Sequence, residues 1–141
     1  MSLVASVDEA LSMILSEGKE ACYARHELVG QAIRSGLTAM GLQLFPEQSE
    51  SRSPALSAFR VPAEVSTALK KHLRETFGIV VASGLGKDYK DKVIRIGHMG
   101  HVYAKDALTI IAAVEASLYH FGAIDSIGAG TAACSRSIIG N

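Results

Sequence analysis

The stretch that most constrains the fold is RIGHMGHV, which spans Arg95 to Val102. It begins inside an apolar run from Lys92 to Gly97, which predicts a β-strand, and it continues into a turn rich in glycine and histidine. An arginine within such a strand is uncommon, because a charged side chain is seldom buried without a partner. Arg95 therefore either binds an anion through its guanidinium group or is a surface arginine on the exposed side of an edge strand.

Apolar spacing on both sides of this stretch predicts further helices and strands. Helices are expected at about 7–40, 62–77 and 103–120, and short strands at 42–45, 55–61, 79–82 and 92–97. A capping-box pattern that begins at Ser6 predicts the start of the first helix, and Gly18 is expected to kink or divide that helix. The tail from Gly122 onward, GAIDSIGAGTAACSRSIIGN, is rich in small residues and is expected to be weakly structured.

This order of elements predicts an α+β fold. The turn between 79–82 and 92–97 predicts an antiparallel hairpin for the last two strands. We expect a small antiparallel or mixed sheet of about four strands, with helices packed on one face and a long N-terminal helix. The length of 141 residues fits one domain, 1–141.

The composition excludes several classes of function. Lys and Arg together number 14, as do Asp and Glu, so the chain has no basic field for nucleic acid. No apolar run approaches the roughly 20 residues of a membrane helix, and the N-terminus does not resemble a secretory signal. Cys22 and Cys134 are not part of a CxxC pattern, which argues against a disulfide scaffold or a zinc knuckle. A reducing, cytoplasmic location is the expectation.

Other candidate motifs in the chain are weak. His98 and His101 could share a metal ion, but no third ligand lies nearby in the sequence, so we expect two loop histidines and no metal site. The segment GLGK, at 84–87, lacks the spacing of a phosphate-binding loop, and GAGTA, at 128–132, lacks the third glycine of a dinucleotide-binding loop. The GxSxG pattern of a serine nucleophile is absent from the sequence.

Four segments of the chain resemble one known family. They read YARHELVGQAIRSGLTAMGLQLF, ALSAFRVP, FGIVVASGLGKDYKDKVIRIGHMGHV and DSIGAGTAAC. Together they resemble the C-terminal small domain of class V, pyridoxal-phosphate-dependent aminotransferases, closest to the alanine–glyoxylate and serine–glyoxylate (serine–pyruvate) group. The resemblance covers nearly the whole chain, and its most specific part is the GLG turn followed by RIGHMG.

The resemblance implies a function and a site. Members of the family move an amino group between a small amino acid, such as alanine or serine, and a 2-oxo acid, such as glyoxylate or pyruvate. The arginine of the family's R-I-G motif binds the substrate carboxylate, and in this sequence it corresponds to Arg95. Gly97, His98 and Gly100 would form the supporting turn beside it. Pyridoxal phosphate as cofactor and a homodimer are also implied.

The departures from the family are equally informative. The family's Schiff-base lysine and its partner for the pyridine nitrogen lie in a large domain upstream, and no lysine here carries that motif. We therefore expect a fragment that binds no cofactor and has no activity alone. Some members carry the label of a soluble hydrogenase subunit, although two unclustered cysteines argue against iron–sulfur chemistry. A stand-alone dimerisation or ligand-binding module is the remaining alternative.

Overall fold

A four-stranded antiparallel sheet forms the centre of the chain in the computed structural model, which describes residues 2–140. The strands are β1 (Leu44–Phe45), β2 (Leu56–Arg60), β3 (Ala82–Ser83) and β4 (Val93–Gly97). The helices are α1 (Ser2–Glu17), α2 (Lys19–Ala39), α3 (Ala63–Phe77), α4 (Ala104–His120) and α5 (Ala129–Ile139), with a short 3-10 helix η1 (Ser49–Ser51). The predicted α+β class with about four strands is confirmed.

The order of strands places Arg95 in the interior of the sheet. The sheet runs β1-β2-β4-β3, and each neighbouring pair is antiparallel, including the predicted β3–β4 pair. Arg95 lies opposite Ala58 on one side and Ala82 on the other. The prediction of an edge strand for a surface arginine is therefore wrong, because β4 has a strand on both sides.

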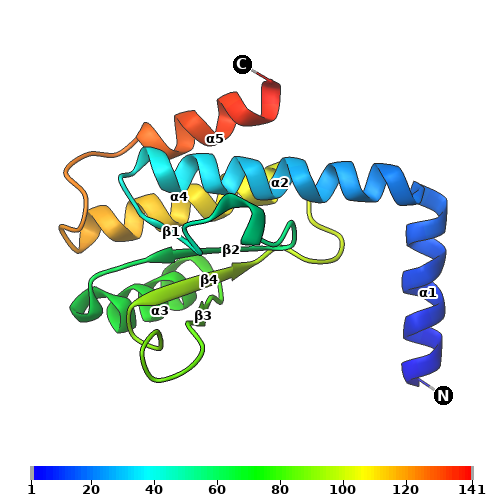
Figure 1. Cartoon of the computed structure of the whole chain (residues 1–141), viewed down its shortest axis with the longest axis horizontal. Coiled ribbons are helices and arrows are strands. Elements are labelled where there is room, and N and C mark those ends of the chain that lie inside the picture. Colours follow the sequence, from blue (N-terminus) through cyan, green and yellow to red (C-terminus); the bar gives the residue numbers. More distant parts are fainter. Residues whose placement is uncertain (1, 141) are drawn as a thin grey trace.

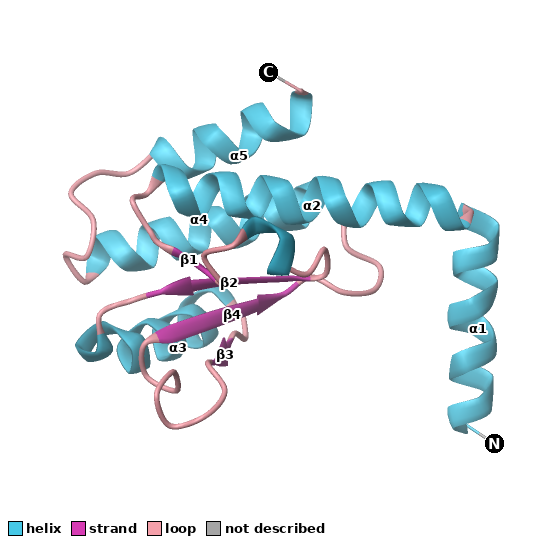
Figure 2. Ribbon diagram, in the orientation of Figure 1, coloured by secondary structure: helices cyan, strands magenta, loops and turns pink. Residues whose placement is uncertain are grey.

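The hydrophobic core lies on one face of the sheet, between the strands and the helices (Figures 1 and 2). Phe59 and Ile94 are paired across β2 and β4 and are completely buried, as expected for the inward face of a half-covered sheet. The helices contribute further buried side chains, among them Ile33, Leu37, Leu69, Leu73, Ile111, Val114 and Leu118. The predicted layer arrangement, with helices on one face, is confirmed.

The long N-terminal helix is in fact two helices that meet at Gly18. Gly18 has a φ of 90°, a backbone conformation that favours glycine, and α2 begins directly after it. α1 leaves α2 at a steep angle and has no buried residue (Figure 1). The expected start at Ser6 is wrong, because α1 begins at Ser2 and the Ser6 hydroxyl donates to the Ser2 carbonyl at 3.0 Å.

The tail forms a helix, which corrects the expectation of a weakly structured segment. α5 packs against α2 and α4, and its small residues permit a close approach. A side chain at Gly36 would come within 3.1 Å of the Gly130 carbonyl oxygen, and one at Gly130 within 2.8 Å of Met40 Cγ. The small residues thus serve packing rather than flexibility.

The strand expected at 79–82 is wrong in most of its residues, because β3 is shorter and begins at the last of them. Only Ala82 and Ser83 form β3, whereas Ile79 and Val81 pack against the core from an irregular segment after the left-handed cap of α3 at Gly78. None of the helices described is long and apolar enough to span a membrane.

Candidate functional site

The face of the sheet that the helices leave uncovered carries the candidate site. Residues that lie opposite one another across the strands share a face, and those on the face of Arg95 are Phe45, Leu56, Ala58, Arg60, Ala82, Val93, Arg95 and Gly97. Two of them are arginines and none is acidic, so this face has a positive charge that no carboxylate of the same face neutralises. Such a face favours an anionic ligand.

Small residues surround Arg95 on this face. Ala58 and Ala82 flank it across the sheet, and Gly97 follows it along the strand. A side chain at Gly97 would meet only Met99 Cε, at 3.8 Å, so the position is open rather than crowded. Arg95 itself is half-buried. The flanking side chains beside the guanidinium group are therefore short.

The guanidinium group of Arg95 is only partly used within the chain. Its Nε donates to the backbone carbonyl of Ser83 at 2.7 Å. Within residues 2–140, its Nη1 and Nη2 make no hydrogen bond and no ion pair. Arginine can bind a carboxylate through two parallel hydrogen bonds, and that capacity remains available at the terminal nitrogens.

Arg60 supplies the second charge of this face. Its guanidinium carbon lies 5.1 Å from the centroid of the Phe45 ring, in a cation–π contact, and Phe45 also packs against Tyr89 with ring centroids 5.0 Å apart. The guanidinium group of Arg60 thus already has an aromatic partner, Phe45, whereas among residues 2–140 no aromatic contact is described for Arg95.

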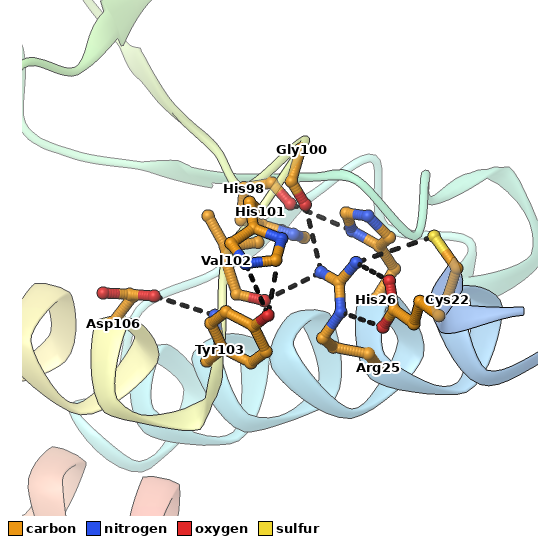
Figure 3. Close-up of polar contacts among 10 residues, drawn as sticks. Cys22, Arg25, His26, His98, Gly100, His101, Val102, Tyr103 and Asp106 are labelled. Atoms are coloured by element: carbon orange, nitrogen blue, oxygen red, sulfur yellow. Dashed lines mark hydrogen bonds and ion pairs between the residues drawn. The ribbon is translucent and has the colours of Figure 1, made fainter. Parts of the chain in front are cut away.

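Arg25 of α2 holds the turn that follows β4, a role that the sequence did not reveal. Figure 3 shows its guanidinium group beside the turn residues Gly100 and Val102. Nη1 donates to the carbonyl oxygens of Gly100 and Val102 at 3.0 and 2.9 Å, while Nη2 donates to Glu17 at 2.7 Å. The hydrogen bond from Arg25 lowers the pKa of Glu17. No local pattern in α2 signals this role, because the contacts join residues about 75 positions apart.

His98 is a buried neutral residue of the same turn. Only 1% of it is exposed, and its Nε2 lies 2.9 Å from Ser57 Oγ. Burial lowers its pKa to about 4, and the positive charge of Arg34 acts in the same direction. Its Nδ1 is buried without a hydrogen-bond partner in the described part of the chain.

The structure separates the predicted site residues into two groups. Ser57 is paired with Ile96 and faces the helices, so the His98 ring lies on the helix side, whereas Arg95 lies on the open side. Gly100 adopts a φ of +78° and forms the turn, as expected of a glycine there, and its carbonyl oxygen accepts a hydrogen bond from Arg25. Of the predicted residues, only Gly97 shares the open face with Arg95.

His101 is exposed and contacts the Tyr103 hydroxyl through Nε2 at 2.7 Å. Among the residues described, no group of three or more His, Cys, Asp or Glu side chains is arranged to hold a metal ion.

Known proteins similar to this chain are aminotransferases. Pyridoxamine–pyruvate transaminase of Mesorhizobium japonicum is 40% identical over 116 residues, which are 79% of this chain and 29% of that protein. The crystal structure of pyridoxamine–pyruvate aminotransferase from Mesorhizobium loti superposes with a TM-score of 0.87 at 36% identity, covering 94% of this chain and 34% of that one. No protein-family model matches the chain.

A hydrogenase-subunit name also occurs among the relatives, in agreement with expectation. The soluble hydrogenase 42 kDa subunit of Anabaena cylindrica is 33% identical over 138 residues, which are 96% of this chain and 35% of that protein. The chain thus spans about a third of the length of the curated relatives it matches. By sequence and by fold, it belongs to the class V pyridoxal-phosphate-dependent aminotransferases and corresponds to their C-terminal small domain.

Proposed function

We propose that this chain is the small domain of a longer aminotransferase, in which Arg95 binds the carboxylate of a small 2-amino or 2-oxo acid. The observation that carries the proposal is an arginine with both terminal nitrogens available on an acid-free sheet face. The 2-amino acids and 2-oxo acids proposed here as substrates each carry a carboxylate beside the reacting carbon, so a planar, bidentate donor suits both of them.

The names of the relatives support the choice of substrate class. They include pyridoxamine–pyruvate transaminase and serine–glyoxylate aminotransferase, and pyruvate and glyoxylate are both small 2-oxo acids. We propose an exchange between alanine or serine and one of these oxo acids. The small residues around Arg95 suit a substrate of this size, because bulk at Ala58, Ala82 or Gly97 would narrow the face.

We propose that the residues of this chain do not hold pyridoxal phosphate by themselves. Such a site needs a lysine that is shielded and free to react with the cofactor's aldehyde. Among the lysines of residues 2–140, Lys70 alone is not exposed, and its ammonium group donates to Ser83 Oγ at 2.6 Å. We therefore propose that the rest of the longer protein holds the cofactor and that this domain binds none.

We further propose that the longer enzyme works as a homodimer in the cytoplasm. The support for a partner is α1, whose side chains Leu3, Val4 and Leu15 are each more than 70% exposed. Apolar surface of this extent on one helix is usually covered by another part of an assembly.

The proposal is tested by substitution of Arg95 in the cofactor-loaded longer protein. Arg95→Ala should lower kcat/KM for both the amino acid and the oxo acid by roughly 30-fold or more, as expected for a loss of about 2–5 kcal/mol. Arg95→Lys should restore only part of this, because an ammonium group lacks the bidentate fork. Arg74→Ala removes an exposed arginine of α3 and is the matched control, with no expected effect. Wild-type kcat/KM in Arg95→Ala would falsify the assignment.

A further inference from the structure

The hydrogen bonds of Arg95 continue to a second cation on the other side of the sheet. Arg95 Nε donates to the Ser83 carbonyl oxygen at 2.7 Å, and Lys70 Nζ donates to Ser83 Oγ at 2.6 Å. Ser83 therefore connects a lysine of α3 to the arginine of β4. The Ser83 side chain faces the helices, because Ser83 is paired with Ile94. Its carbonyl oxygen accepts the hydrogen bond from Arg95, whose side chain lies on the open face.

The position of Ser83 explains why such a connection is needed. β3 has only two residues and lies at the edge of the sheet, so it is held to the rest of the fold on one side only. A short edge strand is the part of a sheet that is most easily displaced. The bond from Lys70 gives β3 a second attachment, to α3, at the residue that receives Arg95.

Occupation of Nε restricts how Arg95 can bind a carboxylate. A guanidinium group offers two edges for bidentate contact, one made of Nε and an Nη nitrogen and one made of the two Nη nitrogens. Because Nε–H is already donated to Ser83, only the Nη1–Nη2 edge remains for a ligand. The carboxylate must then approach the end of the arginine side chain, where Nη1 and Nη2 lie, rather than the edge that contains Nε.

We propose that Lys70 is a positioning residue which, through Ser83, fixes the orientation of Arg95 so that a substrate carboxylate binds end-on to Nη1 and Nη2. This inference rests on the proposed carboxylate-binding role of Arg95. Lys70 does not touch the substrate. It acts by holding the Ser83 carbonyl group in place, which limits the rotation of the guanidinium group and reduces the entropy lost on binding.

The first measurement needs neither substrate nor cofactor. In the chain itself, NMR of the arginine Nε–H groups should show slow hydrogen exchange at Arg95, because this N–H is bonded to Ser83. Lys70→Met and Ser83→Ala should each accelerate this exchange several-fold while the backbone amide spectrum of the core is retained. Lys71→Met is the matched control, since Lys71 is the adjacent, exposed lysine of α3.

The second measurement is made in the cofactor-loaded longer protein, with pyruvate as the varied substrate. Lys70→Met and Ser83→Ala should each raise KM about 2- to 12-fold with a smaller change in kcat, which is the effect expected for one hydrogen bond. The double variant should be no worse than the worse single variant, because both changes remove the same contact. Lys70→Arg, which can still donate to Ser83 Oγ, should recover most of the affinity.

The outcomes separate this inference from the proposed function. If Arg95→Ala impairs pyruvate binding while the Lys70 and Ser83 variants leave both KM and Nε–H exchange at wild-type values, the positioning role is wrong and the proposed function stands. If Arg95→Ala has no effect on pyruvate binding, the proposed function fails, and the inference fails with it whatever the exchange measurement shows. Faster exchange without a change in KM would also overturn the role of Lys70 in binding.

Discussion

Arg95 and His98 lie three residues apart in the sequence and occupy opposite environments. Arg95 keeps an available charge on the open face, whereas His98 is held neutral among the helices. The difference arises from the alternation of the strand, which sends neighbouring side chains to opposite faces. A charge that is available to a ligand and an uncharged structural histidine therefore arise from one short motif.

The buried neutral state of His98 predicts that stability falls as the pH is lowered. Its folded pKa of about 4 lies below the ordinary value of 6.5, so the unfolded chain takes up the proton first. The stability that neutral His98 contributes is fully present above pH 6.5. As the pH falls from 6.5 toward 4, the free energy of unfolding decreases by roughly 3 kcal/mol, at 1.36 kcal/mol per pH unit. Denaturant unfolding of wild type and His98→Gln at pH 7 and 4.5 measures it, and the variant should show the flatter dependence.

A second variant checks the cause of that pH dependence. The guanidinium group of Arg34 is one of the charges that disfavour protonated His98. Arg34→Gln should therefore raise the pKa of His98, as followed by NMR of its ring protons. A His98 pKa near 6.5 in the wild-type chain would contradict this account of the buried ring.

The sequence reveals Arg95 but not the residues that support it. An arginine in an apolar strand is visible in the pattern, because its burial without a partner would be costly. The contacts of Arg25, Ser57 and Lys70 depend on which elements meet in space, and no local spacing encodes them. Sequence reasoning thus identifies the candidate anion-binding residue and leaves its positioning to the structure.

At the scale of the elements, the start of α5 depends on a carboxylate from α4. Glu115 Oε1 accepts the Gly130 N–H at 2.6 Å, and Oε2 accepts the Thr131 hydroxyl at 2.6 Å and the Thr131 N–H at 3.2 Å. These N–H groups have no partner within the helix, and a negative charge at a helix N-terminus is favourable. Burial alone would raise the pKa of Glu115, but the hydrogen bonds from Thr131 and Gly130 outweigh it and the pKa is lowered.

Replacement of Glu115 should therefore loosen α5. In Glu115→Gln an amide N–H group must face donors, so we expect a loss of about 1–3 kcal/mol in the free energy of unfolding at pH 7. Amide hydrogen exchange should accelerate first in α5. Glu75→Gln, at an exposed position of α3, is the control. Equal stability of Glu115→Gln and wild type would show that the buried carboxylate does not hold the helix.

This contact also explains why the sequence pattern of the tail does not predict a helix. Small residues such as those of GAGTAAC have little helical periodicity, so the pattern carries no apolar stripe. The stabilisation comes instead from close packing on α2 and from the distant Glu115. The division of the first helix shows the converse case, since Gly18 is a local signal and was recognised in the sequence.

For the whole molecule, the core is one cluster, and two surfaces lie outside it. Buried residues from β2, β4 and α2 to α5 form one cluster, so this part of the chain has what it needs to fold. α1 and the open face of the sheet contribute little to that cluster. The apolar side chains of α1 and the two arginines of the open face are thus the surfaces where the proposed longer protein would contact this domain.

The same arrangement predicts how the chain behaves with pyridoxal phosphate alone. Its exposed lysines should give only weak, scattered reaction, because none lies in an enclosed site, and Lys70 is engaged by Ser83. An absorbance titration, followed by borohydride reduction and intact mass measurement, should thus show no stoichiometric adduct. Lys70→Met should give the same result as wild type. A single adduct on one lysine, above all on Lys70, would mean that this domain holds its own cofactor. It would contradict the proposal that the rest of the longer protein binds pyridoxal phosphate.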